Sequence, residues 1–138
     1  MSTYLHTMIR VFDLDRSLAF YRLLGMHEIR RCEVREGRYT LVYIGYADNA
    51  QGQAEIELTY NWDQKTPYDI GNGFGHFALG VPNVSAVVEK VREGGGKVTR
   101  EAGPVKFGKT IIAFLADPDG YKVELIERPD GTEKEFKF

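Results

Sequence analysis

The stretch Leu5-His6-Thr7-Met8-Ile9-Arg10-Val11 recurs later in the chain as Gly75-His76-Phe77-Ala78-Leu79-Gly80-Val81. A second stretch, Ile56-Glu57-Leu58-Thr59-Tyr60, recurs as Val123-Glu124-Leu125-Ile126-Glu127. Apolar and β-branched residues recur at alternate positions in these stretches, which predicts β-strands. The first pair of strands carries a histidine and the second pair a glutamate, so the sequence predicts an internal duplication that includes a chemical site.

The duplication extends to the surrounding elements. A shift of 70 residues places His6 on His76, whereas the two glutamates need a shift of 67. The same shift of 70 places Asp13 on Asn83, and each of these capping residues precedes a helical pattern that ends at glycine. Each module is therefore predicted to run strand, helix, strand, strand, strand. The expected elements are 4–12, 13–24, 26–34, 39–46 and 54–60, then 75–81, 83–92, a strand from 97, 110–116 and 121–127.

This order predicts an α+β fold of two tandem βαβββ modules, residues 4–60 and 74–127, forming a curved mixed sheet. Residues 61–73 are rich in Asp, Pro, Gly and other polar groups, and we interpret them as a linker. Two such modules side by side would make an open cup. We expect residues 1–138 to form a single domain with a charged, frayed tail after the last strand.

The composition narrows the class of protein. A formal charge of −2 and a pI near 5.9 give no electrostatic case for binding nucleic acid or an anionic membrane. No segment approaches the roughly 18 apolar residues of a membrane helix, and the first residues do not resemble a signal peptide. The single cysteine, Cys32, cannot form an internal disulfide, and its strand pattern predicts a packed side chain. We expect a cytoplasmic protein.

Two neutral imidazoles and two carboxylates form a ligand set for a divalent ion such as Ni²⁺, Co²⁺, Zn²⁺ or Fe²⁺. The candidate ligands are His6, Glu57, His76 and Glu124. Burying two carboxylates without a cation is costly, which favours an ion. Two alternatives stay open: each histidine is simply a hydrogen-bonded polar group, or Glu57 belongs with Glu55 to a solvated face.

Side chains two residues apart in a strand share a face. Arg10 therefore lies on the face of His6, and Asn61 on the face of Glu57, each about 13 Å along its strand at ~3.3 Å per residue. A cation and an amide at that distance suit the carboxylate of a bound substrate.

Seven motifs resemble glyoxalase I (lactoylglutathione lyase) over about residues 4–127: LHTMIRV, DLDRSLAFY, LGM, IELTYNW, GHFALGV, TREAGPVK and ADPDGYKVELIE. The resemblance places the chain in the vicinal oxygen chelate superfamily. It implies conversion of the hemithioacetal of methylglyoxal and glutathione to S-lactoylglutathione, which detoxifies methylglyoxal. It also implies that the four candidate ligands bind the metal in a homodimer. His6 and Glu57 would come from one chain and His76 and Glu124 from the other, although some relatives build the site within one chain.

The chain departs from the family pattern at two places. FYRLLGM is one residue shorter than the usual spacing of the first helix, and Asn72 stands where animal forms have an arginine that helps to hold glutathione. The short chain resembles the bacterial class that prefers Ni²⁺ or Co²⁺ over Zn²⁺. For the substrate, we expect Arg10 and Asn61 to hold the γ-glutamyl end and Arg100 or Lys106 the glycine carboxylate.

The reaction moves a proton between adjacent carbons through an enediolate. We expect Glu124 to carry the proton and Glu57 to stay the firmer ligand. The first alternative is a thiol-transferring resistance enzyme or an iron dioxygenase on the same modules. Those proteins bind their metal with three protein ligands, so Glu57, as a fourth ligand, distinguishes this chain from them. A metal-free protein that binds a small molecule is the second alternative.

Overall fold

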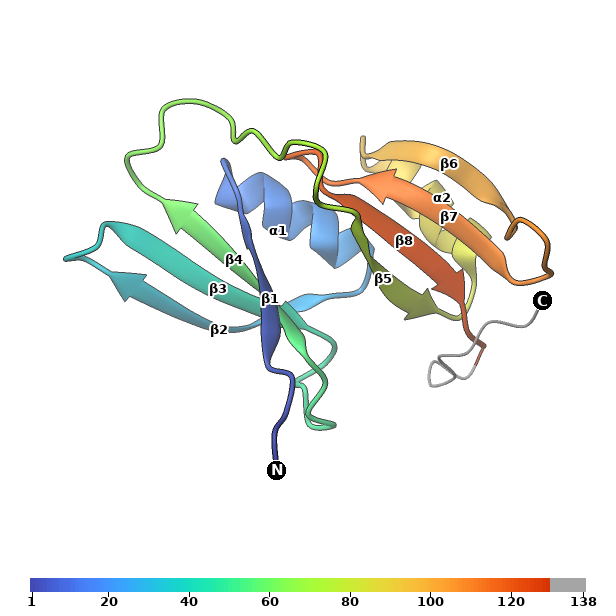
Figure 1. The fold of residues 1–138 in the computed structure, drawn as a ribbon, viewed down its shortest axis with the longest axis horizontal. Helices are drawn as coiled ribbons and strands as arrows, with labels where there is room; N and C mark the ends of the chain where they lie inside the picture. The colour runs from blue at the N-terminus through green and yellow to red at the C-terminus, as the bar shows by residue number, and fades with distance from the viewer. Residues whose placement is uncertain (130–138) are drawn as a thin grey trace. The chain divides into compact units, whose positions relative to one another are not determined.

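The computed structural model describes residues 1–129, which fold as two compact units, Met1–Asp69 and a second that begins at Ile70. The elements are shown in Figure 1. The first unit contains β1 (His6–Arg10), α1 (Leu14–Leu23), β2 (His27–Val34), β3 (Tyr39–Gly45) and β4 (Glu55–Asn61). The second contains β5 (His76–Val81), α2 (Val84–Glu93), β6 (Lys97–Pro104), β7 (Ile111–Ala116) and β8 (Lys122–Glu127).

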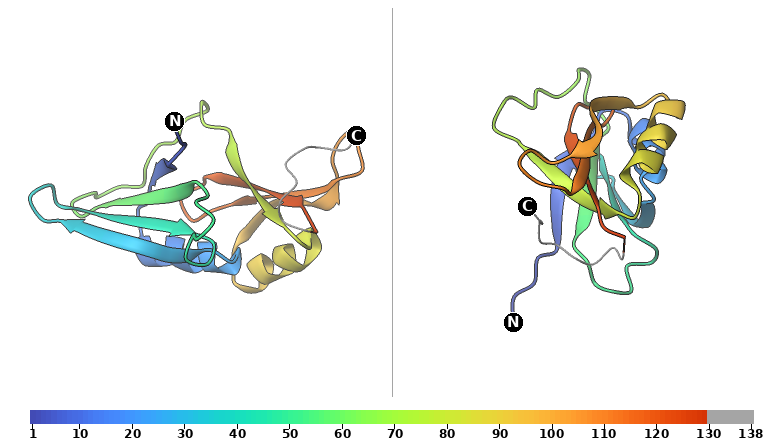
Figure 2. Two further views of the ribbon diagram at one scale, coloured as in Figure 1. Left: turned by 90° about the horizontal axis from the view of Figure 1, so that it is seen from below. Right: turned by 90° about the vertical axis from the view of Figure 1, so that its right-hand side faces the viewer.

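The first unit is a four-stranded sheet in the order β1-β4-β3-β2. The outer strand β1 runs parallel to β4, and the remaining neighbours are antiparallel. Helix α1 connects β1 to β2 and covers one face of this sheet, as the left view of Figure 2 shows. The other face is therefore the one on which the polar residues of β1 and β4 can gather.

The second unit repeats the first, with the order β5-β8-β7-β6 and a parallel pairing of β5 with β8. Even an irregularity is repeated, because the strand pairing shifts register at Arg30 in β2 and at Arg100 in β6. These arginines are 70 residues apart, which is the shift of the histidines. The predicted α+β fold of two βαβββ modules is confirmed. That both units make one domain stays a prediction.

The helix ends follow from the residues predicted to cap them. The Asp13 carboxylate accepts a hydrogen bond from the backbone N–H of Arg16, and the Asn83 side chain accepts one from Ala86. Glu127 gives the second helix a further cap by accepting from the N–H of Val84 at 3.0 Å. Both helices end before a glycine with positive φ, Gly25 at 87° and Gly95 at 80°. These caps determine the residues at which each helix begins and ends.

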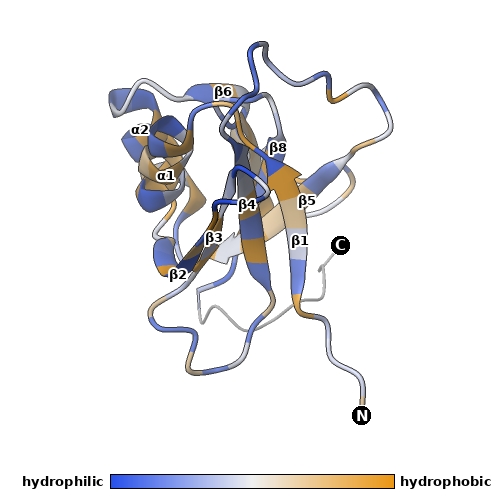
Figure 3. Ribbon diagram, turned by 90° about the vertical axis from the view of Figure 1, so that its left-hand side faces the viewer, coloured by the Kyte–Doolittle hydropathy of each residue, from blue (hydrophilic) through white to orange (hydrophobic). Residues whose placement is uncertain are grey.

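Alternation along β4 separates the core from the open face. Ile56 and Leu58 are buried on the helix side, whereas Glu55, Glu57 and Thr59 point to the other side. Figure 3 shows this alternation as bands of different hydropathy along β4. Glu55, Glu57 and Thr59 are also buried, so this part of the open face is not a simple solvated surface.

Several expected details are different in the structure. Strands expected to begin at residues 4, 54, 75, 110 and 121 begin one or two residues later. Cys32 is exposed, so its expected packing is wrong: β2 is an edge strand, and its register shift alters which residues face the core. The charged tail lies largely outside the described residues. Among residues 1–129, no helix has the length and apolar character needed to cross a membrane.

Candidate metal and substrate site

The first candidate pair comes from neighbouring parallel strands of the first unit. His6 in β1 is in register with Glu55 of β4, and Glu57 lies two residues further on the same face. The Nε2 atom of His6 is 2.8 Å from a carboxylate oxygen of Glu57. The parallel pairing therefore brings together residues from the first and last strands of the unit.

The second unit builds its pair in the same way. His76 in β5 is in register with Lys122 of β8, and Glu124 lies two residues beyond. The Nε2 atom of His76 is 3.2 Å from a carboxylate oxygen of Glu124. The duplication thus produces two histidine–glutamate pairs from the same register, as the sequence indicated.

The donor atoms of these pairs suit a divalent ion. Glu57 and Glu124 are only 9% and 8% exposed, and burial of such carboxylates favours a nearby cation. Imidazole nitrogen and carboxylate oxygen are ligands of first-row divalent metals. Among the described residues, no group of three or more His, Cys, Asp or Glu side chains could hold a metal. Each unit by itself therefore offers two of the four predicted ligands.

The surroundings of the two glutamates differ. Glu57 is paired across the β3–β4 ladder with Tyr43, whose pKa is raised by burial and then by hydrogen bonding and charge interaction with Glu57. The Thr59 hydroxyl also lies 3.4 Å from Glu57. Glu124 is paired instead with Phe114, and Ile126 stands two residues beyond it. Sequence reasoning missed Tyr43, although pairing of 39–46 with 54–60 as a hairpin would have placed a tyrosine opposite the glutamate.

Glu55 is not part of a solvated face. It is 8% exposed, lies 2.7 Å from Arg30, and accepts a hydrogen bond of 2.7 Å from the side chain of Asn49. The alternative that Glu55 and Glu57 simply face solvent is therefore wrong. Both carboxylates are held in a polar network on the open face of the first sheet.

Arg10 and Asn61 lie at the far ends of the strands that carry the first pair. Arg10 is in register with Thr59, and Asn61 lies two residues beyond Thr59 on β4. Glu57 lies in the same way two residues beyond Glu55, the partner of His6. Arg10 is exposed, whereas the Asn61 amide donates a hydrogen bond of 2.9 Å to the Tyr68 hydroxyl. The substrate-binding role of both residues stays a prediction.

Arg100 and Lys106, the candidates for the glycine carboxylate, lie in β6 and in the loop after it. The Arg100 guanidinium donates to the backbone carbonyls of Gly103 and Ile112 at 3.1 Å and of Pro104 at 2.8 Å. These bonds hold the irregular part of the β6–β7 ladder together. The Lys106 ammonium lies 5.0 Å from the ring centre of Phe107, which is 85% exposed. Their role in substrate binding also stays a prediction.

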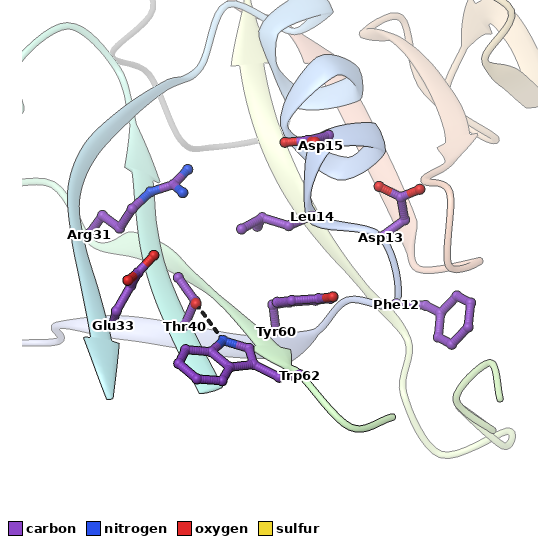
Figure 4. Close-up of a pocket in the computed structure, with 9 residues that line it drawn as sticks. All are labelled: Phe12, Asp13, Leu14, Asp15, Arg31, Glu33, Thr40, Tyr60 and Trp62. Atoms are coloured by element: carbon purple, nitrogen blue, oxygen red, sulfur yellow. Dashed lines mark hydrogen bonds between the residues drawn. The ribbon is translucent and has the colours of Figure 1, made fainter. Parts of the chain in front are cut away.

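A cavity of about 480 Å³ opens on the helix side of the first sheet (Figure 4). The start of α1 and the side chains of Arg31, Thr40, Tyr60 and Trp62 line it, and the Trp62 indole donates to the Thr40 hydroxyl at 2.8 Å. Thr40 and Tyr60 are each three residues from a site residue on their strand, so they point to the opposite face. This cavity contains none of the predicted site residues.

A family model described as the Glyoxalase/Bleomycin resistance protein/Dioxygenase superfamily matches residues 3–125. The chain belongs to this superfamily. Within it, the chain is 56% identical to the lactoylglutathione lyase of Salmonella typhimurium over 127 residues, 91% of this chain and 93% of that protein. It is also 56% identical to a probable lactoylglutathione lyase of Vibrio parahaemolyticus over 129 residues, 93% of this chain and 92% of that protein.

Solved structures of the superfamily agree with the fold. Glyoxalase I from Zea mays matches with a TM-score of 0.86 and 45% identity over 92% of this chain, which spans 45% of the maize chain. The trypanothione-dependent glyoxalase I of Leishmania major matches with a TM-score of 0.80 and 40% identity over 92% of this chain and 87% of that chain. The predicted resemblance to glyoxalase I is confirmed. Enzymes of the glyoxalase I family generally use a divalent metal.

Proposed function

We propose that the chain is a lactoylglutathione lyase that isomerises the methylglyoxal–glutathione hemithioacetal to S-lactoylglutathione. The observation that carries this proposal is the repeated histidine–glutamate pair, at 2.8 Å in one unit and 3.2 Å in the other. Relatives that carry the name lactoylglutathione lyase, at 56% identity over nine-tenths of the chain, support it. Neither the thiol-transferring alternative nor the metal-free binder has comparable support among the relatives.

His6, Glu57, His76 and Glu124 would hold one divalent ion, with Ni²⁺ or Co²⁺ preferred over Zn²⁺. When bound, such an ion supplies positive charge for the oxygen anions that develop as the substrate loses its proton. We propose a homodimer in which His6 and Glu57 of one chain and His76 and Glu124 of the other complete the site. Two protein ligands from one unit are fewer than a stable site requires, so the pair of one unit needs the pair of another to complete the site.

Glu124 is the proposed general base and acid. A carboxylate near both carbons can remove the proton from the carbon that bears sulfur and return it to its neighbour. Glu57, the second catalytic carboxylate, is held in its orientation by the Thr59 hydroxyl at 3.4 Å, and Tyr43 lies across the ladder from it. The neighbours Phe114 and Ile126 are apolar and offer Glu124 no hydroxyl, so we propose that Glu124 changes position more easily than Glu57.

Substrate binding falls to the cationic and amide groups around the pairs. We propose that Arg10 and Asn61 hold the γ-glutamyl end of the glutathione adduct, and Arg100 or Lys106 its glycine carboxylate. Asn72 replaces the arginine of the animal forms, which leaves these groups to supply the binding charge. We also propose that the enzyme acts in the cytoplasm.

The test is an assay of metal-free protein reconstituted separately with Ni²⁺, Co²⁺ and Zn²⁺, given methylglyoxal and glutathione. We expect the thioester to form only after metal is added, and its ultraviolet absorbance measures its formation. The His27→Ala protein is a matched control, because His27 is exposed at the start of β2. Absence of the thioester with every metal would refute the proposed activity. Elemental analysis that finds no ion bound by the purified protein or after reconstitution would instead favour the metal-free binder.

A further inference from the structure

Tyr43 stands at the centre of a chain of contacts on the open face of the first sheet. Its ring meets the edge of the His6 ring, with centres 5.5 Å apart and planes at 77°. On its other side, the guanidinium carbon of Arg30 lies 4.0 Å from the ring centre, and Arg30 pairs with Glu55 at 2.7 Å. The tyrosine ring is therefore fixed from both sides by residues that are themselves held.

Tyr43 lies directly across the β3–β4 ladder from Glu57, so the two side chains are neighbours on the open face. Burial and then the hydrogen bond to Glu57 raise the pKa of Tyr43. A tyrosine hydroxyl is a donor at neutral pH and a carboxylate is an acceptor, so the interaction restrains the Glu57 side chain. This contact lies within one unit and involves only described residues.

The second unit has the same arrangement without the hydroxyl. Phe114 lies across the β7–β8 ladder from Glu124, and its ring meets the edge of the His76 ring at 5.1 Å and 85°. The arginine that corresponds to Arg30, Arg100, points its guanidinium at backbone carbonyls. An aromatic ring thus contacts the histidine in both units. The first unit, unlike the second, also has a hydroxyl group on that ring, which can donate to the glutamate.

We propose that Tyr43 is a positioning residue whose hydroxyl holds Glu57 in its metal-binding orientation, while Phe114 leaves Glu124 free to move. This inference rests on the metal site of the proposed function. Hydrogen-bonded partners of a ligating carboxylate limit its rotation and raise metal affinity, and their loss typically costs about 10- to 100-fold in affinity or activity. The two ring positions thereby give two otherwise similar glutamates different freedom.

The first test measures Ni²⁺ and Co²⁺ affinity of the full-length Tyr43→Phe protein by competition with a coloured chelator. The substitution keeps the ring contacts with His6 and Arg30 and removes the hydroxyl, so we expect the dissociation constant to rise by about 10-fold or more. The visible absorption of the Co²⁺ form should also change. Tyr46→Phe is the matched control, because its hydroxyl donates to the Leu24 carbonyl at 3.3 Å instead. Affinity and Co²⁺ spectrum equal to those of the control would overturn the inference.

The reciprocal test is Phe114→Tyr, which offers a hydroxyl to Glu124. We expect metal affinity to be kept or increased and the turnover number to fall at least several-fold, because the restrained glutamate moves less easily. An unchanged turnover number would contradict the proposed freedom of Glu124. If the unsubstituted protein bound no metal, the proposed function and this inference would both fail. Normal metal binding and turnover in the unsubstituted protein, with no effect of Tyr43→Phe, would refute this inference alone.

Discussion

Glu57 and Glu124 are buried to almost the same extent, 9% and 8% exposed, but a hydroxyl-bearing ring faces one and a phenyl ring faces the other. Equal burial removes solvent access as the source of a difference between them. The difference comes from hydrogen bonding, because Tyr43 acts on Glu57 whereas Phe114 has no donor. Two carboxylates placed by the same register are therefore suited to different tasks.

Glu124→Gln should keep most of the metal but lose most of the turnover. An amide oxygen can still ligate the ion, but the amide cannot accept and return a proton, and loss of a positioned base typically costs about 10²–10⁴-fold in rate. Metal content and turnover number should be measured together, with Glu57→Gln as the comparison. If Glu57→Gln lost far more turnover than Glu124→Gln at equal metal content, the two roles would be reversed.

His76→Ala should lower metal occupancy or turnover by orders of magnitude, because four ligands leave no spare. The same loss is expected for His6→Ala, since both histidines lie within 3.2 Å of their glutamates. Occupancy is measured by elemental analysis after dialysis, with exposed His27→Ala as the control. Near-normal occupancy and turnover in the His76→Ala protein would contradict the four-ligand site.

Arg10→Ala should raise the Michaelis constant for the hemithioacetal more than it lowers the turnover number. Arg10 is exposed and distant from the pair along its strand, so it is suited to bind a part of the substrate away from the reacting carbons. A lost charge-assisted contact is worth roughly 1.5–3 kcal/mol, which is about 10- to 100-fold in binding. Arg16→Ala on the helix is the control. A Michaelis constant equal to that of the control would remove Arg10 from the substrate site.

Arg100→Ala should lower thermal stability, because its guanidinium donates hydrogen bonds to four backbone carbonyls at the irregular β6–β7 pairing. We expect a loss of about 1–3 kcal/mol in the free energy of unfolding, since charged donors to partly buried carbonyls are replaced by water. Denaturant unfolding measures it, and Arg22→Ala on the first helix is the control. Unchanged stability with a raised Michaelis constant would instead assign Arg100 to the glycine carboxylate.

Reconstitution with Ni²⁺ or Co²⁺ should restore activity, whereas Zn²⁺ should bind and support little. Zn²⁺ readily accepts four ligands, while the substrate oxygens need two further positions on a six-coordinate ion. Turnover of each metal form, normalised to metal content, decides the matter. Equal turnover with zinc and nickel would remove the protein from the nickel-preferring class without changing the reaction.

Much of the fold could be predicted because it depends on local patterns. Asp13 and Asn83 marked the helix starts, and the repeated spacing of His6 and His76 revealed the duplication. The packing of Cys32 was predicted wrongly, because strand alternation does not show which strand lies at the edge or where its register shifts. Tyr43 was missed for a related reason: its importance comes from its partner across the ladder, which a single strand does not specify.

The parallel pairing of first and last strands has a consequence for how the protein folds. His6 lies in the strand that opens its unit and Glu57 in the strand that closes it, and the same holds for His76 and Glu124. Such contacts between distant parts of the chain form only after the entropic cost of closing the intervening loop has been met. An ion that binds such a pair recognises only the closed unit and stabilises it by mass action. Metal binding would then slow hydrogen exchange of the backbone amides throughout a module, including the slowest-exchanging ones, and not only of those near the site.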